Sequence, residues 1–258
     1  MPFELVNILF ALPLYALILF RLGGLMMTAP MLSSSVIPIR VRAALAMTMA
    51  AMIFPLMVHA LPRELTMVDV LVGSVAEIMI GATIGLSLSL VLLMADIAGM
   101  IVGQQGGLAL GQIFDPTLNR QSTVSGQVYL IVLTLIFLIV GGHREMVAAL
   151  LDTFDAIPLM SFQYERSVLT LLIEILSSAF VMGIRVAGPV LIALFLLGTA
   201  LGFLSRTMPQ FNILTIGFTL RLLVALGTAG LALAACRDLF VDSIWDGVAA
   251  LRSALGLP

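Results

Sequence analysis

The sequence predicts an all-α, polytopic membrane protein, and three observations support this fold class. Hydrophobic residues make up 61% of the chain and charged residues only 10%, whereas a soluble globular protein carries about 25% charged residues. The apolar runs are continuous and do not alternate as the strands of a membrane barrel do. Several runs approach or reach the roughly 17–25 residues that a spanning helix needs.

The N-terminal part contains three apolar segments that predict long helices: about 5–28, about 41–61, and from about 67 past Glu77 to at least Asp96. On the third segment, Gly81 and Gly85 form a pair of small residues at the spacing that lets transmembrane helices approach closely.

The stretch from Gly99 to Pro116 combines glutamines that do not suit a lipid-facing helix with large apolar side chains that do not suit a loop in water. Irregular backbone at membrane depth is tolerated only where protein buries it or where it lines a cavity. We therefore predict that the helix ends at about Gly103 and that a re-entrant loop inside a protein pathway follows. Because glycines recur every four residues, a packed helix as far as Gly111 is the competing interpretation. The residues assigned to this predicted loop are Gln104, Gln105, Gly106, Gly107, Leu108, Leu110, Gly111, Ile113 and Phe114.

The C-terminal part contains three apolar segments that predict long helices, at about 122–140, at about 167–204, and from the turn at 206–212 to about 235. Two further segments predict amphipathic helices, at 143–166 and 237–255. Pro189 should kink or divide the long apolar segment, because proline cannot donate the helical hydrogen bond. The last amphipathic helix is expected to offer its apolar face to an interface or a partner.

Charged residues inside apolar segments are costly, so they face a protein interior or a cavity. Glu174 is one of them. A proton or anion relay is one interpretation of these charges. We favour Arg–carboxylate pairs that fix the register of helices or subunits. The residues assigned to this role are Arg21, Glu77, Asp96, Arg185, Arg206 and Arg221.

No residue pattern indicates catalysis, a cofactor or a metal site. All twelve basic residues are arginine, which excludes a phosphate-binding loop ending in Gly-Lys, a Schiff-base lysine and, with a net charge of −2, a basic patch for nucleic acid. His59 and His143 are far apart and have no second ligand at a useful spacing. We therefore expect a membrane protein that is not an enzyme.

The distribution of arginines does not decide the topology. With six spans and the N-terminus outside, four loop arginines fall on one side and five on the other. The positive-inside rule needs a clear excess. Either some helices do not span the membrane, or partners fix the orientation of the chain.

An ordered series of short motifs resembles the FliR family, the flagellar type III export-gate proteins, which are related to the SctT proteins of virulence injectisomes. Each motif is weak alone, but their order and spacing cover nearly the whole chain. They are Arg21-x-x-Gly24, Thr28-Ala29-Pro30-Met31-Leu32, Ile37-Pro38-x-Arg40-Val41, Ile84-Gly85, Gly103-x-Gln105-x-Gly107-Leu108, Phe114-Asp115-Pro116, Gly142-His143, Asp152-Thr153-Phe154, Ile157-Pro158-Leu159, Leu201-Gly202-x-Leu204-x-Arg206-x-x-Pro209-Gln210-x-Asn212 and Gly217-Phe218.

The resemblance implies a non-enzymatic subunit of the flagellar export gate, in the bacterial inner membrane within the basal body. It implies a P-like portion at about 1–180 followed by a Q-like helical hairpin at about 181–258, and a plug formed by the segment from Gln104 to Phe114. The implied partners are P-type and Q-type gate subunits that form a helical pore ring with the chain, the B-type switch subunit, and unfolded flagellar export substrates.

Two other functions are compatible with the residues. A stand-alone proton-coupled small-molecule transporter would use Glu77, Asp96 and Arg185 as its site. A structural membrane scaffold would contain no pathway. Co-purification with P-type and Q-type gate subunits would distinguish the export gate from the transporter, and crosslinks from position 108 or 114 to a stalled export substrate would exclude the scaffold.

Overall fold

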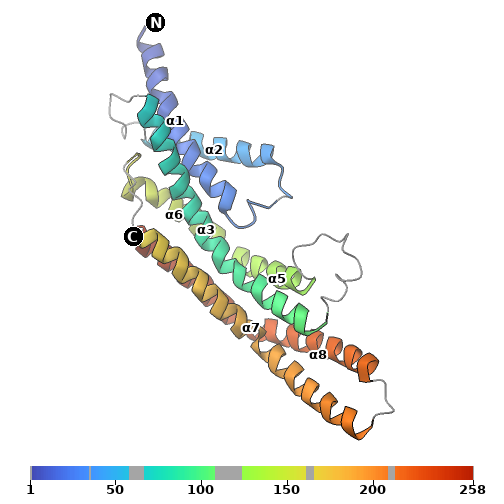
Figure 1. The fold of residues 1–258 in the computed structure, drawn as a ribbon. Helices are drawn as coiled ribbons and strands as arrows, with labels where there is room; N and C mark the ends of the chain where they lie inside the picture. The colour runs from blue at the N-terminus through green and yellow to red at the C-terminus, as the bar shows by residue number, and fades with distance from the viewer. Residues whose placement is uncertain are drawn as a thin grey trace. The chain divides into compact units, whose positions relative to one another are not determined.

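The computed structural model describes residues 2–34, 36–57, 67–107, 124–160, 166–208 and 213–257, and the regular structure within these ranges is entirely helical (Figure 1). The helices are α1 (Pro2–Thr28), α2 (Ile39–Met57), α3 (Met67–Gln105), α5 (Val124–Val140), α6 (Gly142–Ala156), α7 (Arg166–Thr207), α8 (Ile213–Ala235) and α9 (Arg237–Ala254). The predicted all-α fold class is confirmed.

Length and apolar composition make four helices able to cross a membrane. These helices are α2, α3, α7 and α8. A fifth span results if α5 and α6, which are bent by 61° relative to each other, are counted as one broken or re-entrant span. The bend falls at Gly141, whose φ of 85° is a left-handed conformation that glycine adopts without steric cost.

The helix α7 runs through Pro189 without interruption, so of the two expected outcomes the division is wrong and the kink stays a prediction. Its 42 residues make it the longest helix of the described chain. Proline is tolerated inside transmembrane helices, because neighbouring groups satisfy the carbonyl that loses its partner.

The amphipathic patterns of α6 and α9 are confirmed by burial, because Met146, Leu150 and Phe154 of α6 are buried. The apolar face of α9 is also buried within the chain, through Phe240, Ile244, Val248, Leu251 and Leu255. The expectation that this face is offered to an interface or a partner is therefore wrong.

The chain divides into two compact units. The first comprises residues 1–90, 141–175 and 245–258, and the second comprises residues 91–140 and 176–244. Each unit therefore combines segments that are distant in the sequence. The predicted division near residue 180 into P-like and Q-like portions is a different kind of boundary and stays a prediction.

In the first unit, α1 and α3 run parallel and in direct backbone contact (Figure 1). A Cβ atom added to Gly24 would lie 2.2 Å from the carbonyl oxygen of Ile78, and one added to Gly81 would lie 1.8 Å from the carbonyl oxygen of Arg21. The side chains of Thr28 and Ser89 add hydrogen bonds across the pair, to Ala82 O (3.0 Å) and Thr28 O (2.5 Å) respectively. Glycine is needed here because the two backbones touch.

Because a parallel pair needs a crossover, α2 lies between α1 and α3 in the sequence and packs back on α1. The hydroxyl of Tyr15 donates to Met47 O at 3.0 Å, and its ring meets Phe54 edge to face.

In the second unit, α3 crosses α5 and α7 closely. Ser125 Oγ donates to Gly99 O at 2.7 Å, and a Cβ atom on Gly99 would lie 2.3 Å from Gly126 Cα. A Cβ atom on Gly183 would lie 2.8 Å from the side chain of Ile97. Close helix packing at a glycine, which the regular spacing of glycines predicts, is therefore observed at Gly99.

The neighbouring glycines of α1 provide a direct test of the close α1–α3 contact. Gly24→Ala should lower the free energy of unfolding by about 1–3 kcal/mol, because the added methyl group overpacks the contact. Gly23→Ala is the matched control, because nothing lies within 4 Å of its Cβ position, and alanine favours a helix over glycine by about 1 kcal/mol. Thermal unfolding of the purified variants in detergent measures both. Equal stability of the two variants would contradict the described contact.

Candidate functional site

The contact between α1 and α3 positions a fully buried ion pair. The carbonyl oxygen of Arg21 lies against Gly81, and the Arg21 side chain reaches Glu77, one turn earlier on α3. Arg21 Nε lies 2.5 Å from Glu77 Oε2, and both side chains are 0% exposed. A buried charge is tolerated only with a close partner, and the missing side chain at Gly81 lets Arg21 come close enough to find one.

Groups at the C-terminal end of α6 accept the remaining hydrogen bonds of the Arg21 guanidinium. Arg21 Nη1 donates to Thr153 O at 3.0 Å and to Thr153 Oγ1 at 3.2 Å, and Nη2 donates to Ile157 O at 3.2 Å. The guanidinium carbon lies 4.4 Å from the centroid of the Phe154 ring. The C-terminus of a helix carries partial negative charge and has carbonyls without helical partners, so a cation stabilises it.

Glu77 holds the other side of the turn that follows α6. Its Oε1 accepts a hydrogen bond from the backbone N–H of Met160 at 3.0 Å. Met160 has a φ of 67°, a left-handed conformation that is unfavourable for a side chain with a Cβ atom. The Arg21–Glu77 pair therefore binds both ends of residues 157–160, because Arg21 contacts the carbonyl of Ile157 and Glu77 contacts the N–H of Met160.

Arg21 and Glu77, two of the residues predicted to fix helix register, therefore pair with each other within the chain. Because Arg21 and Met160 N–H engage both carboxylate oxygens of Glu77, Glu77 is not free to bind a solute. In the second unit, the described contacts contain no ion pair or hydrogen bond between Asp96 and Arg185. Glu77 belongs to the first unit and Asp96 and Arg185 to the second, so the transporter site stays a prediction.

Asp96 is half-buried, and the three remaining arginines assigned to register are exposed on the surface of the chain: Arg185, Arg206 and Arg221. No ion pair forms at these four positions within the described residues. Arg185 Nη1 lies 3.9 Å from the sulfur of Met182.

One ion-pair cluster was not predicted. Arg252 of α9 lies 2.9 Å from Asp152 and 3.5 Å from Glu145 of α6. The signal was the spacing of the two acids, because residues seven apart share one face of a helix. Within the described ranges, no three histidine, cysteine or acidic side chains gather where they could hold a metal ion.

The helix α3 ends at Gln105, two residues beyond the predicted end at Gly103, and the side chains of Gln104 and Gln105 are exposed. Gly106 N–H still donates to Val102 O at 2.8 Å, but Gly107 has a φ of 83° and leaves the helical path. The uninterrupted helix therefore stops before Gly107, and residues 108–111 of the competing interpretation, a packed helix as far as Gly111, lie outside the described residues. The other residues assigned to the predicted loop lie outside the described residues: Leu108, Leu110, Gly111, Ile113 and Phe114.

The two glycines after α3 dock on α8. A Cβ atom on Gly106 would lie 2.8 Å from Ala225 Cβ, and one on Gly107 would lie 3.1 Å from Phe218 Cε2. Phe218 and Ala225 are two turns apart, so they share one face of α8. A larger residue at either glycine would push the end of α3 away from α8.

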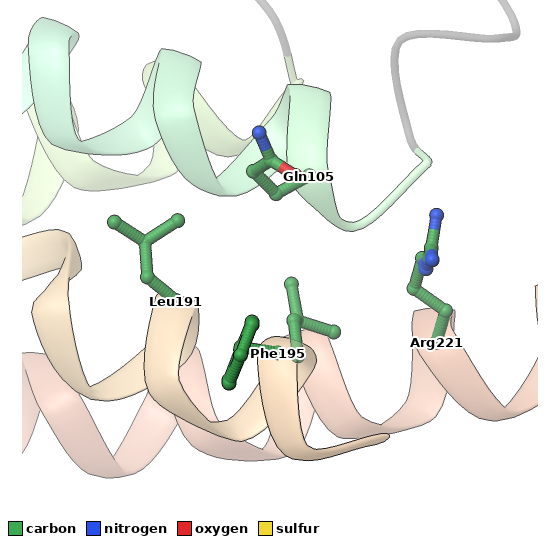
Figure 2. Close-up of a pocket in the computed structure, with 5 residues that line it drawn as sticks. Gln105, Leu191, Phe195 and Arg221 are labelled. Atoms are coloured by element: carbon green, nitrogen blue, oxygen red, sulfur yellow. The ribbon is translucent and has the colours of Figure 1, made fainter. Parts of the chain in front are cut away.

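A cavity of about 390 Å³ lies beside this docking point (Figure 2). Its lining combines one amide, one cation and an apolar wall: Gln105, Arg221, Leu191, Leu194 and Phe195. Figure 2 shows Arg221 rising from α8 and Gln105 at the last turn of α3.

Comparison with known proteins identifies similar chains. The family model described as bacterial export proteins, family 1, matches residues 12–246. The flagellar biosynthetic protein FliR of Escherichia coli strain K12 is 32% identical over 222 residues, which cover 83% of this chain and 82% of that protein. The FliR protein of Pectobacterium carotovorum is 31% identical over a region that covers 83% of this chain and 81% of that protein. The FliR protein of Caulobacter vibrioides is 27% identical over a region that covers 88% of this chain and 91% of that protein.

A double-mutant cycle tests the buried ion pair. Glu77→Ala should lower the free energy of unfolding by about 3–5 kcal/mol, because it leaves a buried guanidinium without its counter-charge. Arg21→Met is the second single variant of the cycle, and the double variant Arg21→Met, Glu77→Ala should lose less than the sum of the two single losses, because it leaves no buried charge without a partner. Unfolding of the purified protein in mixed micelles measures the three variants. Glu174→Gln, on the exposed surface of α7, is the control. Additive losses would contradict the pairing.

Proposed function

We infer that this chain, which belongs to the FliR family of bacterial export proteins, contributes to the closed state of the flagellar protein export channel. It is a membrane protein of the flagellar export apparatus. Within that apparatus we assign it the role of a non-enzymatic subunit that completes a helical pore ring with P-type and Q-type subunits. The proposed location is the bacterial inner membrane, within the flagellar basal body.

The docking of Gly106 and Gly107 on α8 carries the plug proposal. It fixes the point at which the segment after α3 leaves the helix, next to Phe218 and Ala225. The residues that follow in the sequence combine apolar bulk with a further glycine at 111. A segment of this composition supplies side chains that fill a pore, and its start is anchored on α8.

Charges and apolar side chains left exposed on the second unit support subunit contacts. Arg185 and Arg206 of α7 are exposed and Asp96 is half-buried, in helices that are otherwise apolar. Such charges need a counter-charge or a cavity. We assign these three residues to contacts with neighbouring ring subunits. The exposed large apolar residues of α7 and α8 would be covered in the same way: Ile184, Ile192, Leu196, Phe203, Leu223, Leu226 and Leu231.

The packing of α7 against α8 supports a hairpin in the C-terminal part. A Cβ atom on Gly217, near the start of α8, would lie 3.3 Å from Leu201, near the end of α7, so the two helices run antiparallel. This agrees with a Q-like hairpin at about 181–258 after a P-like portion at about 1–180. The remaining proposed partners are the B-type switch subunit and unfolded flagellar substrates.

Replacing the apolar side chains of the proposed plug should open the membrane to small ions. The variant carries serine at Leu108, Leu110, Ile113 and Phe114, and we expect it to assemble with the gate subunits normally. The matched control carries serine at Ala109 and Gln112, in the same segment, and should stay tight. Co-purification measures assembly, and a membrane-potential dye in cells measures the leak. A tight membrane with normal export in the first variant would contradict the plug.

Photo-crosslinking distinguishes a pathway from a scaffold. A crosslinker at position 108 or 114 should capture a stalled flagellar substrate, because these positions would face the channel. The control position is Ile139 of α5, which is 83% exposed but is not assigned to the channel. Equal capture from all three positions would contradict the assignment, and a stable monomer that binds a solute would favour the transporter.

A further inference from the structure

We propose that the cavity between α7, α8 and the end of α3 binds an anionic phospholipid. Arg221 would hold the phosphate, and Leu191, Leu194 and Phe195 would line the acyl chain. The proposal concerns the chain by itself in a lipid environment and does not rest on the plug or on the pore ring.

Arg221 has no anion paired with it among the described residues. It is the only charged residue in the sequence of α8 and its side chain is exposed. The described contacts include no acidic partner and no hydrogen bond for it. A guanidinium that lies inside an apolar span is costly unless an anion or water reaches it.

The position of Arg221 along α8 suits a headgroup. The 23 residues of α8 rise about 34 Å, which is sufficient to cross the roughly 30 Å hydrocarbon layer. Arg221 Cα lies about 12 Å along the axis from Ile213, the first residue of the helix. Helical side chains lean toward the helix N-terminus, so the long Arg221 side chain extends toward the near membrane surface, where lipid phosphates lie.

The apolar wall lies deeper than Arg221. Because α7 and α8 are antiparallel, depth along α7 is counted back from Thr207. Phe195 and Leu191 then lie about 18 Å and 24 Å from that end. The cation therefore lies nearer the membrane surface and the apolar residues nearer its middle, which is the polarity of a phospholipid. In Figure 2 the two groups face the same space, with the Gln105 amide above Leu191 and Phe195.

The lining selects for negative charge. Among the described residues, the lining contains one cation and no carboxylate, and a basic pocket between transmembrane helices favours anionic over zwitterionic headgroups. A volume of about 390 Å³ lies within the range of roughly 300–1,000 Å³ typical of ligand sites. The three apolar residues distinguish this site from one for a soluble anion.

Lipid binding to the purified full-length chain tests the proposal. The probes are palmitoyl-oleoyl phosphatidylglycerol and phosphatidylcholine with the same acyl chains, titrated into detergent micelles and followed by native mass spectrometry. We expect the wild-type chain to prefer phosphatidylglycerol by about fivefold. Arg221→Gln should abolish this preference, and Arg221→Lys should keep it, because it restores the charge.

Arg185→Gln is the matched control, because Arg185 is also an exposed arginine on an apolar helix of the second unit but does not line the cavity. It should keep the preference of the wild-type chain. Three outcomes would overturn the proposal: no preference in the wild-type chain, equal loss in Arg185→Gln and Arg221→Gln, or displacement of the lipid by inorganic phosphate alone. Unchanged lipid binding in Arg221→Gln would equally overturn it, and would leave a carboxylate of another protein as the counter-charge.

Discussion

The burial of Arg21 constrains the whole first unit. A guanidinium without access to water needs a carboxylate and several acceptors, and three separate segments provide them. Gly24 and Gly81 let α1 and α3 touch, Glu77 supplies the counter-charge, and the end of α6 supplies the carbonyls. Each contribution depends on the others, because loss of one leaves a buried charge or an unpaired carbonyl. This mutual dependence fixes the parallel register of α1 and α3 and the path of the chain after α6.

Charges in this chain fall into two groups with different consequences. Arg21 and Glu77 are buried and fully engaged within the chain, so they stabilise its own fold. Arg185, Arg206 and Arg221 are exposed on apolar helices and have no acidic partner among the described residues. In the first group, both oxygens of the Glu77 carboxylate are engaged, and in the second we propose that neighbouring subunits or lipid supply the counter-charges. This division favours a subunit of a larger assembly over a protein that works alone.

The helices and the amphipathic faces could be predicted because they depend on local patterns, such as the burial of Met146, Leu150 and Phe154 at helical spacing. Pairing could not. Arg21 and Glu77 are 56 residues apart, and nothing local selects Glu77 over Asp96 as the partner. The docking of Gly106 and Gly107 on α8 and the link from Arg252 to α6 are likewise tertiary contacts. The sequence left open a division of α7 at Pro189, which does not occur, because local propensity overestimates the cost of proline inside a long apolar helix.

The length of α7 has a consequence for the life of the chain in the cell. Its 42 residues rise about 63 Å, and fitting them into about 30 Å of hydrocarbon would need a tilt of about 60°, whereas transmembrane helices tilt by about 0–40°. Part of this helix therefore extends beyond the lipid, where exposed apolar side chains promote aggregation and degradation. Such a chain persists only while other proteins cover it, so its abundance should follow that of its partners.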